Sequence, residues 1–256
     1  MSDELLAERR DDILHVTLNR PEKRNPLSRT LLEALRRCFE ARADDPTLRV
    51  AVLRGAGEKS FAAGGDLKDL GQLRSAEEAG EMADHAKAAL DAVRRFPVPV
   101  VAALNGDALG GGAELAVACD FRVGARHARI GFVQGRLNIA TAWGGGIDLL
   151  DLLGPAAGLR LLARSDLLDM ESARAVGLVD AVAEADQPLD DAVASFVQPM
   201  LRQAPQVLRA FKALAVAHRA GASRSDMERL ETRLFAGTWV HDDHWSAVER
   251  LNLGRR

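Results

Sequence analysis

The chain has 256 residues, of which 47% are apolar, enough for one sizeable hydrophobic core. A formal net charge of −3 argues against a nucleic-acid-binding surface, which is normally basic, and an aromatic content of 4% leaves few rings to stack on bases. The acidic N-terminus is unlike a signal peptide, and no run of about 18 apolar residues suggests a membrane span. Cys38 and Cys119 lie in apolar contexts, so we expect no disulfide framework and a cytoplasmic location.

The first predicted element is a β-hairpin, in which residues 5–8 and 13–18 flank the turn-forming Asp11 and Asp12. Ser28 is then predicted to cap a helix. The following elements alternate between a strand at 49–54, a helix at 76–95, a strand at 99–104, a helix near 112–119 and a strand at 121–123. Short apolar strands alternating with helices indicate an α/β protein whose strands are buried on both faces.

Beyond about residue 185 the pattern becomes nearly all helical. One predicted helix face carries Val207, Leu208, Phe211, Leu214 and Ala215. We therefore divide the chain into an α/β core at residues 1–190 and a helical C-terminal region at 191–256. This region is expected either to make subunit contacts or to cover its own core.

Two glycine-rich turns carry the chemistry, at residues 59–67 (KSFAAGGDL) and 105–115 (NGDALGGGAEL). Each follows a predicted strand and leads toward a helix, where small residues let a ligand approach the backbone closely. Unpaired N–H groups at a helix N-terminus favour negative charge. Either turn alone could be only a tight turn, and neither matches a P-loop. If the two converge, they would form an oxyanion hole of main-chain donors.

The order and spacing of these turns resemble the enoyl-CoA hydratase/isomerase (crotonase) superfamily. The matching segments are Asn-Arg-Pro at 19–21 with Asn25, residues 61–67, residues 105–115 with 118–120, and residues 173–179. The resemblance implies a crotonase-like spiral of ββα units whose helical C-terminal region forms trimers, often paired into hexamers. It also implies an acyl-CoA thioester as ligand. Coenzyme A would then be part of the substrate, with no separate cofactor and no metal.

The resemblance also assigns roles to single residues. The N–H groups of Gly65 and Gly111 would be the oxyanion donors, and Glu114 matches the first glutamate of the hydratases. Substrate contacts are expected at Arg24, Ala62, Ala63, Gly64, Asp66, Leu67 and Gly110. Arg24 is a candidate for the pyrophosphate or 3′-phosphate of CoA, although a solvated surface charge is the slightly favoured explanation.

The second catalytic position departs from the hydratase pattern, because Gln134 stands where hydratases carry another glutamate. A glutamine can orient water or bind a carboxylate, but it cannot accept a proton. The loop at 138–146, with Thr141 and Trp143, resembles the ethylmalonyl-CoA decarboxylase branch. Loss of CO₂ needs no base, and a second carboxylate would repel the departing one. Trp143 is equally an ordinary wall residue of an acyl pocket.

Three functions stay open from the sequence. A decarboxylase of a short malonyl-type acyl-CoA, with Thr141, Gln134 or an inward-turned Arg136 holding the carboxylate, is slightly favoured. The second is an enoyl-CoA hydratase or isomerase that uses Glu114 alone with a water held by Gln134, and the third is a non-catalytic acyl-CoA-binding subunit. The run from His241 to His244 fits a solvated helix start better than a metal site.

Overall fold

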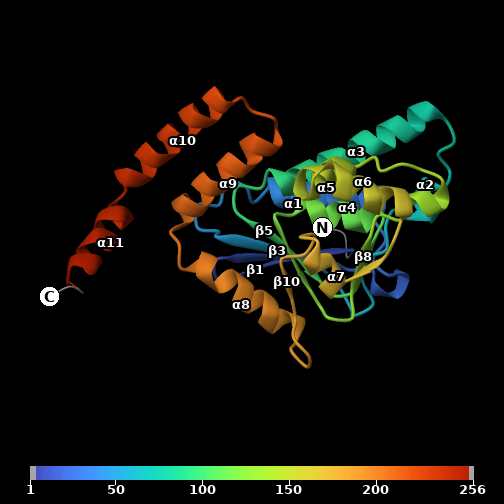
Figure 1. Ribbon diagram of the computed structural model, residues 1–256, viewed down its shortest axis with the longest axis horizontal. Helices are drawn as coiled ribbons and strands as arrows, with labels where there is room; N and C mark the ends of the chain where they lie inside the picture. The colour runs from blue at the N-terminus through green and yellow to red at the C-terminus, as the bar shows by residue number, and fades with distance from the viewer. Residues whose placement is uncertain (1–3, 254–256) are drawn as a thin grey trace.

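The apolar strands of the N-terminal half pair into a six-stranded sheet in the order β1-β2-β3-β5-β7-β10. The computed structural model describes residues 4–253 (Figure 1). The strands are β1 (Leu5–Arg10), β2 (Ile13–Leu18), β3 (Val50–Gly55), β5 (Val100–Leu104), β7 (Phe121–Gly124) and β10 (Ala181–Val182). β1 and β2 form the predicted antiparallel hairpin, and the other neighbours run parallel.

A second sheet of four strands has the order β4-β6-β8-β9. It contains β4 (Ser60–Ala62), β6 (Asp107–Leu109), β8 (Arg129–Gly131) and β9 (Leu168–Asp169). Three successive strand pairs, β3 with β4, β5 with β6, and β7 with β8, each give their first strand to the large sheet and their second to the small one. With the helices that follow, these pairs form the predicted spiral of ββα units.

Helices cover both faces of the large sheet. The helical elements up to residue 201 are η1 (Pro21–Lys23), α1 (Arg29–Glu40), α2 (Leu67–Leu70), α3 (Ala76–Arg94), α4 (Gly111–Ala118), η2 (Gln134–Leu137), α5 (Gly145–Leu153), α6 (Pro155–Arg164), α7 (Met170–Ala175) and α8 (Leu189–Leu201). Ser28 caps α1 as predicted, since its hydroxyl accepts a hydrogen bond from Leu31 N at 3.2 Å. Alternate residues of β3 belong to two separate apolar clusters, so its strand is buried on both faces.

The last three helices are α9 (Pro205–Arg219), α10 (Arg224–Trp239) and α11 (Asp242–Leu253). α10 and α11 form an arm that extends away from the sheets (Figure 1). The apolar face of α9 is only partly buried, because Leu208 is buried whereas Phe211 is 63% exposed and Ala215 is also exposed. Lys212, which is not on that apolar face, is buried too, because it pairs with Asp120 of the core. The boundary at residue 190 stays a prediction.

Two further features concern the whole chain. None of the helices within residues 4–253 combines the length and apolar character needed to cross a bilayer.

Cys38 and Cys119 are both free and buried. Burial raises the pKa of the Cys119 thiol to about 12, so this thiol stays protonated and packs as a small apolar group.

Candidate active site

The two glycine turns lie against each other at the ends of β4 and β6. A Cβ added to Gly64 would lie 3.1 Å from the carbonyl oxygen of Leu109 and 3.6 Å from the amide nitrogen of Gly111. Gly64 and Gly110 have φ angles of 102° and 53°, a region in which glycine is favoured. Leu27 braces the first turn, because its amide donates to Gly64 O at 2.8 Å. The turns predicted to converge are therefore in contact.

The N–H groups of Gly65 and Gly111 are both available to a ligand. Within residues 4–253, neither amide donates a hydrogen bond to a protein group. Gly111 is the first residue of α4, whose first-turn N–H groups have no acceptor inside the helix. The backbone amides around this point carry partial positive charge, which suits an oxygen that gains negative charge.

Glu114 lies in the first turn of α4 and is 2% exposed. Its Oε2 accepts hydrogen bonds from the amides of Trp143 at 2.9 Å and Gly145 at 3.0 Å. Gly145 begins α5, and the preceding Gly144 has no side chain with which to cap it, so Glu114 caps α5 from another helix. Burial raises the pKa of Glu114, although these amides act in the opposite direction. The result is a buried carboxyl with a raised pKa, suited to proton transfer.

Gln134 lies beside Glu114 and contacts its carboxylate. Its Nε2 donates a hydrogen bond to Oε1 of Glu114 at 2.9 Å. Its Oε1 is buried and has no hydrogen-bond partner within residues 4–253. An unpaired buried acceptor is costly, so this oxygen is a site for a donor such as water or a substrate hydroxyl. The structure thus places the two residues that the sequence singled out, Glu114 and Gln134, in direct contact.

Trp143 lies over both glycine turns. A Cβ added to Gly111 would lie 2.3 Å from the indole Cζ3, and one added to Gly65 would lie 3.5 Å from Cη2. The ring therefore packs directly against the Cα of Gly111, with its edge near Gly65. Because the side chain is only 5% exposed, Trp143 forms a buried wall beside the two free N–H groups.

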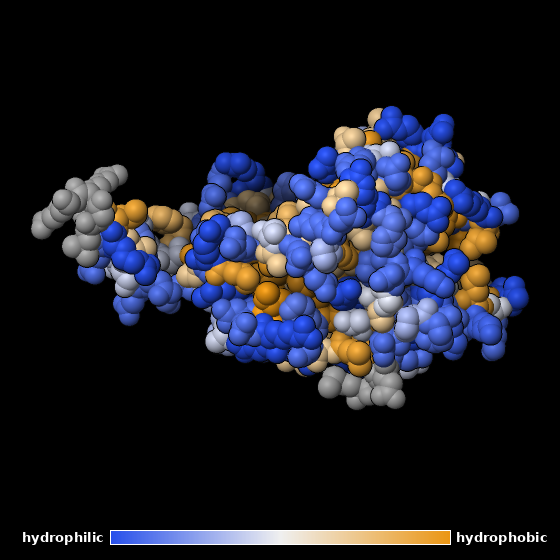
Figure 2. All heavy atoms as spheres, turned by 90° about the horizontal axis from the view of Figure 1, so that it is seen from below, coloured by the Kyte–Doolittle hydropathy of each residue, from blue (hydrophilic) through white to orange (hydrophobic). Residues whose placement is uncertain are grey.

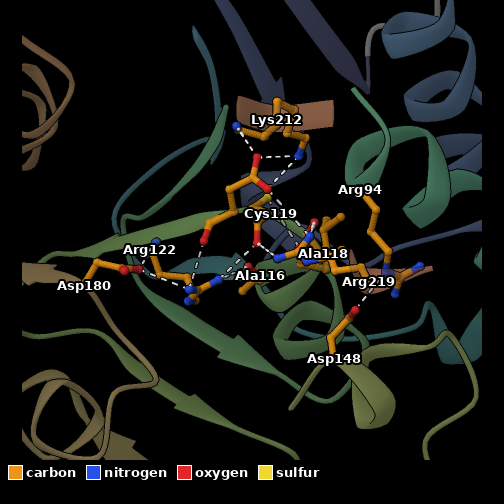
Figure 3. A network of polar contacts seen from close by, with 12 residues as sticks. Arg94, Ala116, Ala118, Cys119, Arg122, Asp148, Asp180, Lys212 and Arg219 are labelled. Atoms are coloured by element: carbon orange, nitrogen blue, oxygen red, sulfur yellow. Dashed lines mark hydrogen bonds and ion pairs between the residues drawn. The ribbon is translucent and has the colours of Figure 1, made fainter. Parts of the chain in front are cut away.

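The C-terminal end of α4 is fixed by buried cations (Figure 3). Arg122 is 2% exposed and donates to the carbonyl oxygens of Ala116 at 3.4 Å and Cys119 at 3.1 Å. Lys212, from α9, binds both carboxylate oxygens of Asp120, at 2.6 and 2.5 Å. Cations at a helix C-terminus complement its dipole. The helix that carries Gly111 and Glu114 is therefore anchored at the end opposite the site.

Other predicted site residues lie around the turns without joining the buried cluster. Ala62 is buried in β4, and Ala63 N donates to Arg24 O at 3.0 Å. The side chain of Arg24 is exposed, and Leu67 is 68% exposed at the start of α2. Both side chains are accessible to a ligand at the surface near the first turn.

Asp66, Thr141 and Arg136 have local roles in the structure. Asp66 binds Arg20 at 2.7 Å and caps α2. Burial alone would raise the pKa of the Asp66 carboxyl. The hydrogen bonds from Arg20 and from the capped amides outweigh burial and hold this pKa below its ordinary value. Thr141 is half-buried, and its hydroxyl lies against Gly146. Arg136 is exposed and donates to Ser165 O at 2.7 Å, so it does not turn inward.

Sequence reasoning gave no role to the polar side chains that hold the loops, although Asn25 and Asn105 stand in the motifs named above. Asn25 and Asn105 both donate from Nδ2 to the carbonyl oxygen of Ser60, at 2.8 and 3.1 Å, which ties the opening segment and the second turn to β4. Arg94 was also missed, although it binds the loop that contacts Glu114. Within the described part of the chain, no group of three or more His, Cys, Asp and Glu side chains is placed to hold a metal ion.

Comparison with known proteins agrees with this geometry. The sequence model of the enoyl-CoA hydratase/isomerase family matches residues 8–251. Mitochondrial methylglutaconyl-CoA hydratase of Rattus norvegicus is 35% identical over 210 residues, which cover 81% of this chain and 66% of that protein. Crotonyl-CoA hydratase of Syntrophomonas wolfei is 33% identical over 189 residues, covering 74% and 72%. The crystal structure of an enoyl-CoA hydratase from Mycobacterium smegmatis matches with a TM-score of 0.91 and 26% identity, covering 100% and 98%.

The fold and the paired glycine turns therefore define a protein of the crotonase superfamily. The chain belongs to the enoyl-CoA hydratase/isomerase family.

Proposed function

We propose that the chain binds an acyl-CoA thioester and catalyses the reversible addition of water to a short 2-enoyl-CoA, with Glu114 as its only acid–base side chain. The observation that carries the proposal is the contact between Glu114 and Gln134 beside two unpaired backbone donors. The names of the relatives in rat and in Syntrophomonas wolfei, both hydratases, support this choice over decarboxylation.

The two glycine turns supply the electrostatic part of the reaction. When water adds to C3 of the enoyl group, negative charge develops on the thioester oxygen. The amides of Gly65 and Gly111 donate to this oxygen and stabilise the enolate without reorganising. One such donor typically contributes roughly 3–4 kcal/mol to transition-state stabilisation. Trp143 packs beside the donors and covers one side of them.

Glu114 and Gln134 supply the proton transfer. Glu114 removes a proton from the attacking water and then delivers that proton to C2, so one carboxyl acts first as base and then as acid. Gln134 donates from Nε2 to Glu114 and accepts from the water at its free Oε1. The same pair runs the reverse dehydration, by removing the proton from C2 and returning it to the leaving hydroxyl.

The CoA portion binds at the first turn in this proposal. Residues 62–67 and Gly110 present backbone to the nucleotide and thioester, and the exposed Arg24 faces a phosphate. Coenzyme A is then part of the substrate, and no separate cofactor is required. The free, buried cysteines fit a reducing compartment such as the cytoplasm.

Decarboxylation of a short malonyl-type acyl-CoA is the second candidate. Its supporting observation is the neutral Gln134, placed where a second carboxylate would repel the departing one. Against it stands Glu114, because an ionised carboxylate in the same buried space repels a substrate carboxylate. We therefore favour hydration over decarboxylation, whereas the sequence alone slightly favours decarboxylation.

The test compares substrates directly. Purified protein is incubated with crotonyl-CoA in ¹⁸O-labelled water and, separately, with ethylmalonyl-CoA and methylmalonyl-CoA, and products are identified by mass spectrometry. We expect the labelled 3-hydroxyacyl-CoA, and we expect its formation to be lost in Glu114→Gln. Loss of CO₂ from the malonyl substrates without hydration would establish the decarboxylase instead. Tight acyl-CoA binding without any product, unchanged in Glu114→Gln, would identify a non-catalytic subunit.

We also propose that the arm mediates self-association into a trimer or a dimer of trimers. No residue of α10 is buried, and the arm exposes Phe235 at 59%, Trp239 at 47% and Trp245 at 47%. Apolar residues show on the arm that extends to the left in Figure 2. Exposed apolar patches commonly mark protein interfaces. Light scattering should show an oligomer that Trp239→Asp dissociates and that Glu231→Ala, on the same helix, leaves intact.

A further inference from the structure

The guanidinium of Arg94 joins three different parts of the chain. Arg94 is the last residue of α3, and its side chain is only 12% exposed. Nε donates to Asp148 of α5 at 2.8 Å, one terminal nitrogen donates to Asp91 of α3 at 2.8 Å, and the other donates to the carbonyl oxygen of Trp143 at 2.9 Å. The planar guanidinium carries N–H donors on three nitrogens in fixed directions, so it can bind these three partners at once.

Residues 143–145 lie directly between Arg94 and Glu114. The carbonyl oxygen of Trp143 accepts from Arg94, and the amide nitrogen of the same residue donates to Glu114 Oε2 at 2.9 Å. Gly144 has a φ of 88°, and a Cβ added there would lie 2.7 Å from the Arg94 guanidinium. A Cβ added to Gly145 would lie 2.4 Å from Cβ of Glu114. The loop is therefore held tightly between the cation and the carboxylate.

We infer that Arg94 is a positioning residue, which aims the amides of Trp143 and Gly145 at Glu114 and so fixes this carboxylate beside Gln134. The inference rests on the proposed function and deepens it, because it names the group that keeps a single acid–base residue oriented. Asp148 is the second residue that holds the loop in place. It lies in the first turn of α5, so its ion pair with Arg94 holds the helix start that presents the Gly145 amide.

The charged groups near Arg94 and Glu114 indicate that Arg94 acts on Glu114 through the loop at 143–145. Asp91 and Asp148 contact the guanidinium, and Arg219 and Asp151 act on Asp148 from farther away. Burial is the largest influence on Glu114, followed by hydrogen bonds from the amides of Trp143, Gly145 and Ala142 and from Gln134. The influence of Arg94 therefore reaches Glu114 through these amides.

The test uses Arg94→Lys and Arg94→Met in the full-length protein, with Arg95→Met as the matched control. Lysine keeps the positive charge but cannot bind Asp148 and the Trp143 carbonyl with one planar fork. Arg95 is the next residue and also an arginine, but it is exposed and is not among the groups that hold the loop, so Arg95→Met should behave as wild type. The first readout is the infrared carboxyl band of Glu114, assigned by difference against Glu114→Gln and followed over a pH series. The second is the steady-state kinetics of crotonyl-CoA hydration.

In both Arg94 variants we expect the Glu114 band to titrate at higher pH, because misdirected amides stabilise the carboxylate less. We also expect kcat to fall by about 10- to 100-fold, with KM changed by less than about threefold. An unchanged Glu114 titration in folded Arg94→Lys would overturn the inference, even if stability or turnover fell. The same shift in Arg95→Met would overturn it too. If the wild type does not hydrate crotonyl-CoA, the proposed function fails, yet the infrared titration still decides the role of Arg94.

Discussion

The side-chain amide of Gln134 donates a hydrogen bond to Oε1 of Glu114 over 2.9 Å, while its own carbonyl oxygen stays buried without a partner in residues 4–253. This orientation follows from chemistry, because an ionised carboxylate accepts only and must face the NH₂ group. Gln134 therefore presents its acceptor to the reacting water while it supports the ionised form of Glu114.

Replacing Gln134 tests both contacts at once. Gln134→Met has a similar volume but neither donates nor accepts strongly, so the Glu114 pKa should rise further and the water should lose its partner. We expect kcat for hydration to fall by about 10²-fold. Gln134→Glu is the informative companion, because two adjacent carboxyls share one proton and should give the pH–rate profile a second limb. A Gln134→Met enzyme with wild-type kcat and pH profile would remove Gln134 from the mechanism.

The pKa of Glu114 makes a second prediction, about stability. Burial raises this pKa above its ordinary value of 4.5, so the native state binds the proton more tightly than the unfolded chain does. The Glu114 carboxyl therefore adds its full contribution to the free energy of unfolding at pH values below 4.5. This contribution is lost as the pH rises through the higher pKa that Glu114 has in the folded protein. The free energy of unfolding of wild type relative to Glu114→Gln should therefore decline over this window. Urea titrations at stepped pH measure the difference, and a flat or rising difference would contradict the raised pKa.

A pair of substitutions at Gly111 isolates the oxyanion donor. Gly111→Ala and Gly111→Pro both add a Cβ, which meets the indole of Trp143 at 2.3 Å, so both variants displace this ring. Only proline also removes the N–H, and the first position of a helix tolerates proline. Turnover should be lower in Gly111→Pro than in Gly111→Ala by roughly 10²-fold. Equal turnover in the two folded variants would show that this N–H does not stabilise the enolate.

The ion pair of Lys212 and Asp120, whose side chains are 2% and 11% exposed, should contribute strongly to the attachment of α9. Lys212→Met leaves the Asp120 carboxylate buried without its main cation, and such a loss typically costs about 3–5 kcal/mol. The double variant Lys212→Met, Asp120→Asn removes both charges and should recover part of this cost. Chemical denaturation of the four proteins in the cycle measures the coupling. A single variant as stable as wild type would mean that water replaces the lysine.

How far the sequence predicts this molecule depends on the range of the interactions involved. The hairpin, the Ser28 cap and the alternation of strands with helices depend on neighbouring residues, and all three are present. On α9 the apolar spacing groups Phe211 with Leu208, yet Phe211 is exposed and Lys212 is buried, because Lys212 pairs with Asp120, 92 residues away. Periodicity cannot report a partner at that distance. The spiral arrangement of the strands came from the family resemblance.

In the candidate site, too, local motifs are predictable from the sequence and long-range contacts are not. The glycine turns are continuous motifs, so their contact was predictable from the resemblance, and Glu114 was found with them. The contact of Glu114 with Gln134 joins residues 20 positions apart, and that of Arg94 with Trp143 joins residues 49 apart. Nothing local to Arg94 distinguishes it from the neighbouring Arg95. Only the fold, which brings the end of α3 to Asp148 and to the loop before α5, gives it a role.

The indole of Trp143 should set the size of the acyl group. It packs against Gly111 and lies next to Gly65, so a thioester held by these amides has its acyl chain beside the ring. Trp143→Ala keeps the backbone contacts to Glu114 and Arg94 but empties the space. We expect kcat/KM for longer straight-chain 2-enoyl-CoA substrates to rise relative to crotonyl-CoA by about tenfold or more. Truncating a buried tryptophan typically costs about 3–5 kcal/mol of stability, so Trp143→Phe serves as the milder companion. If neither variant changes the chain-length preference, the acyl group lies on the other side of the oxyanion donors, away from this ring.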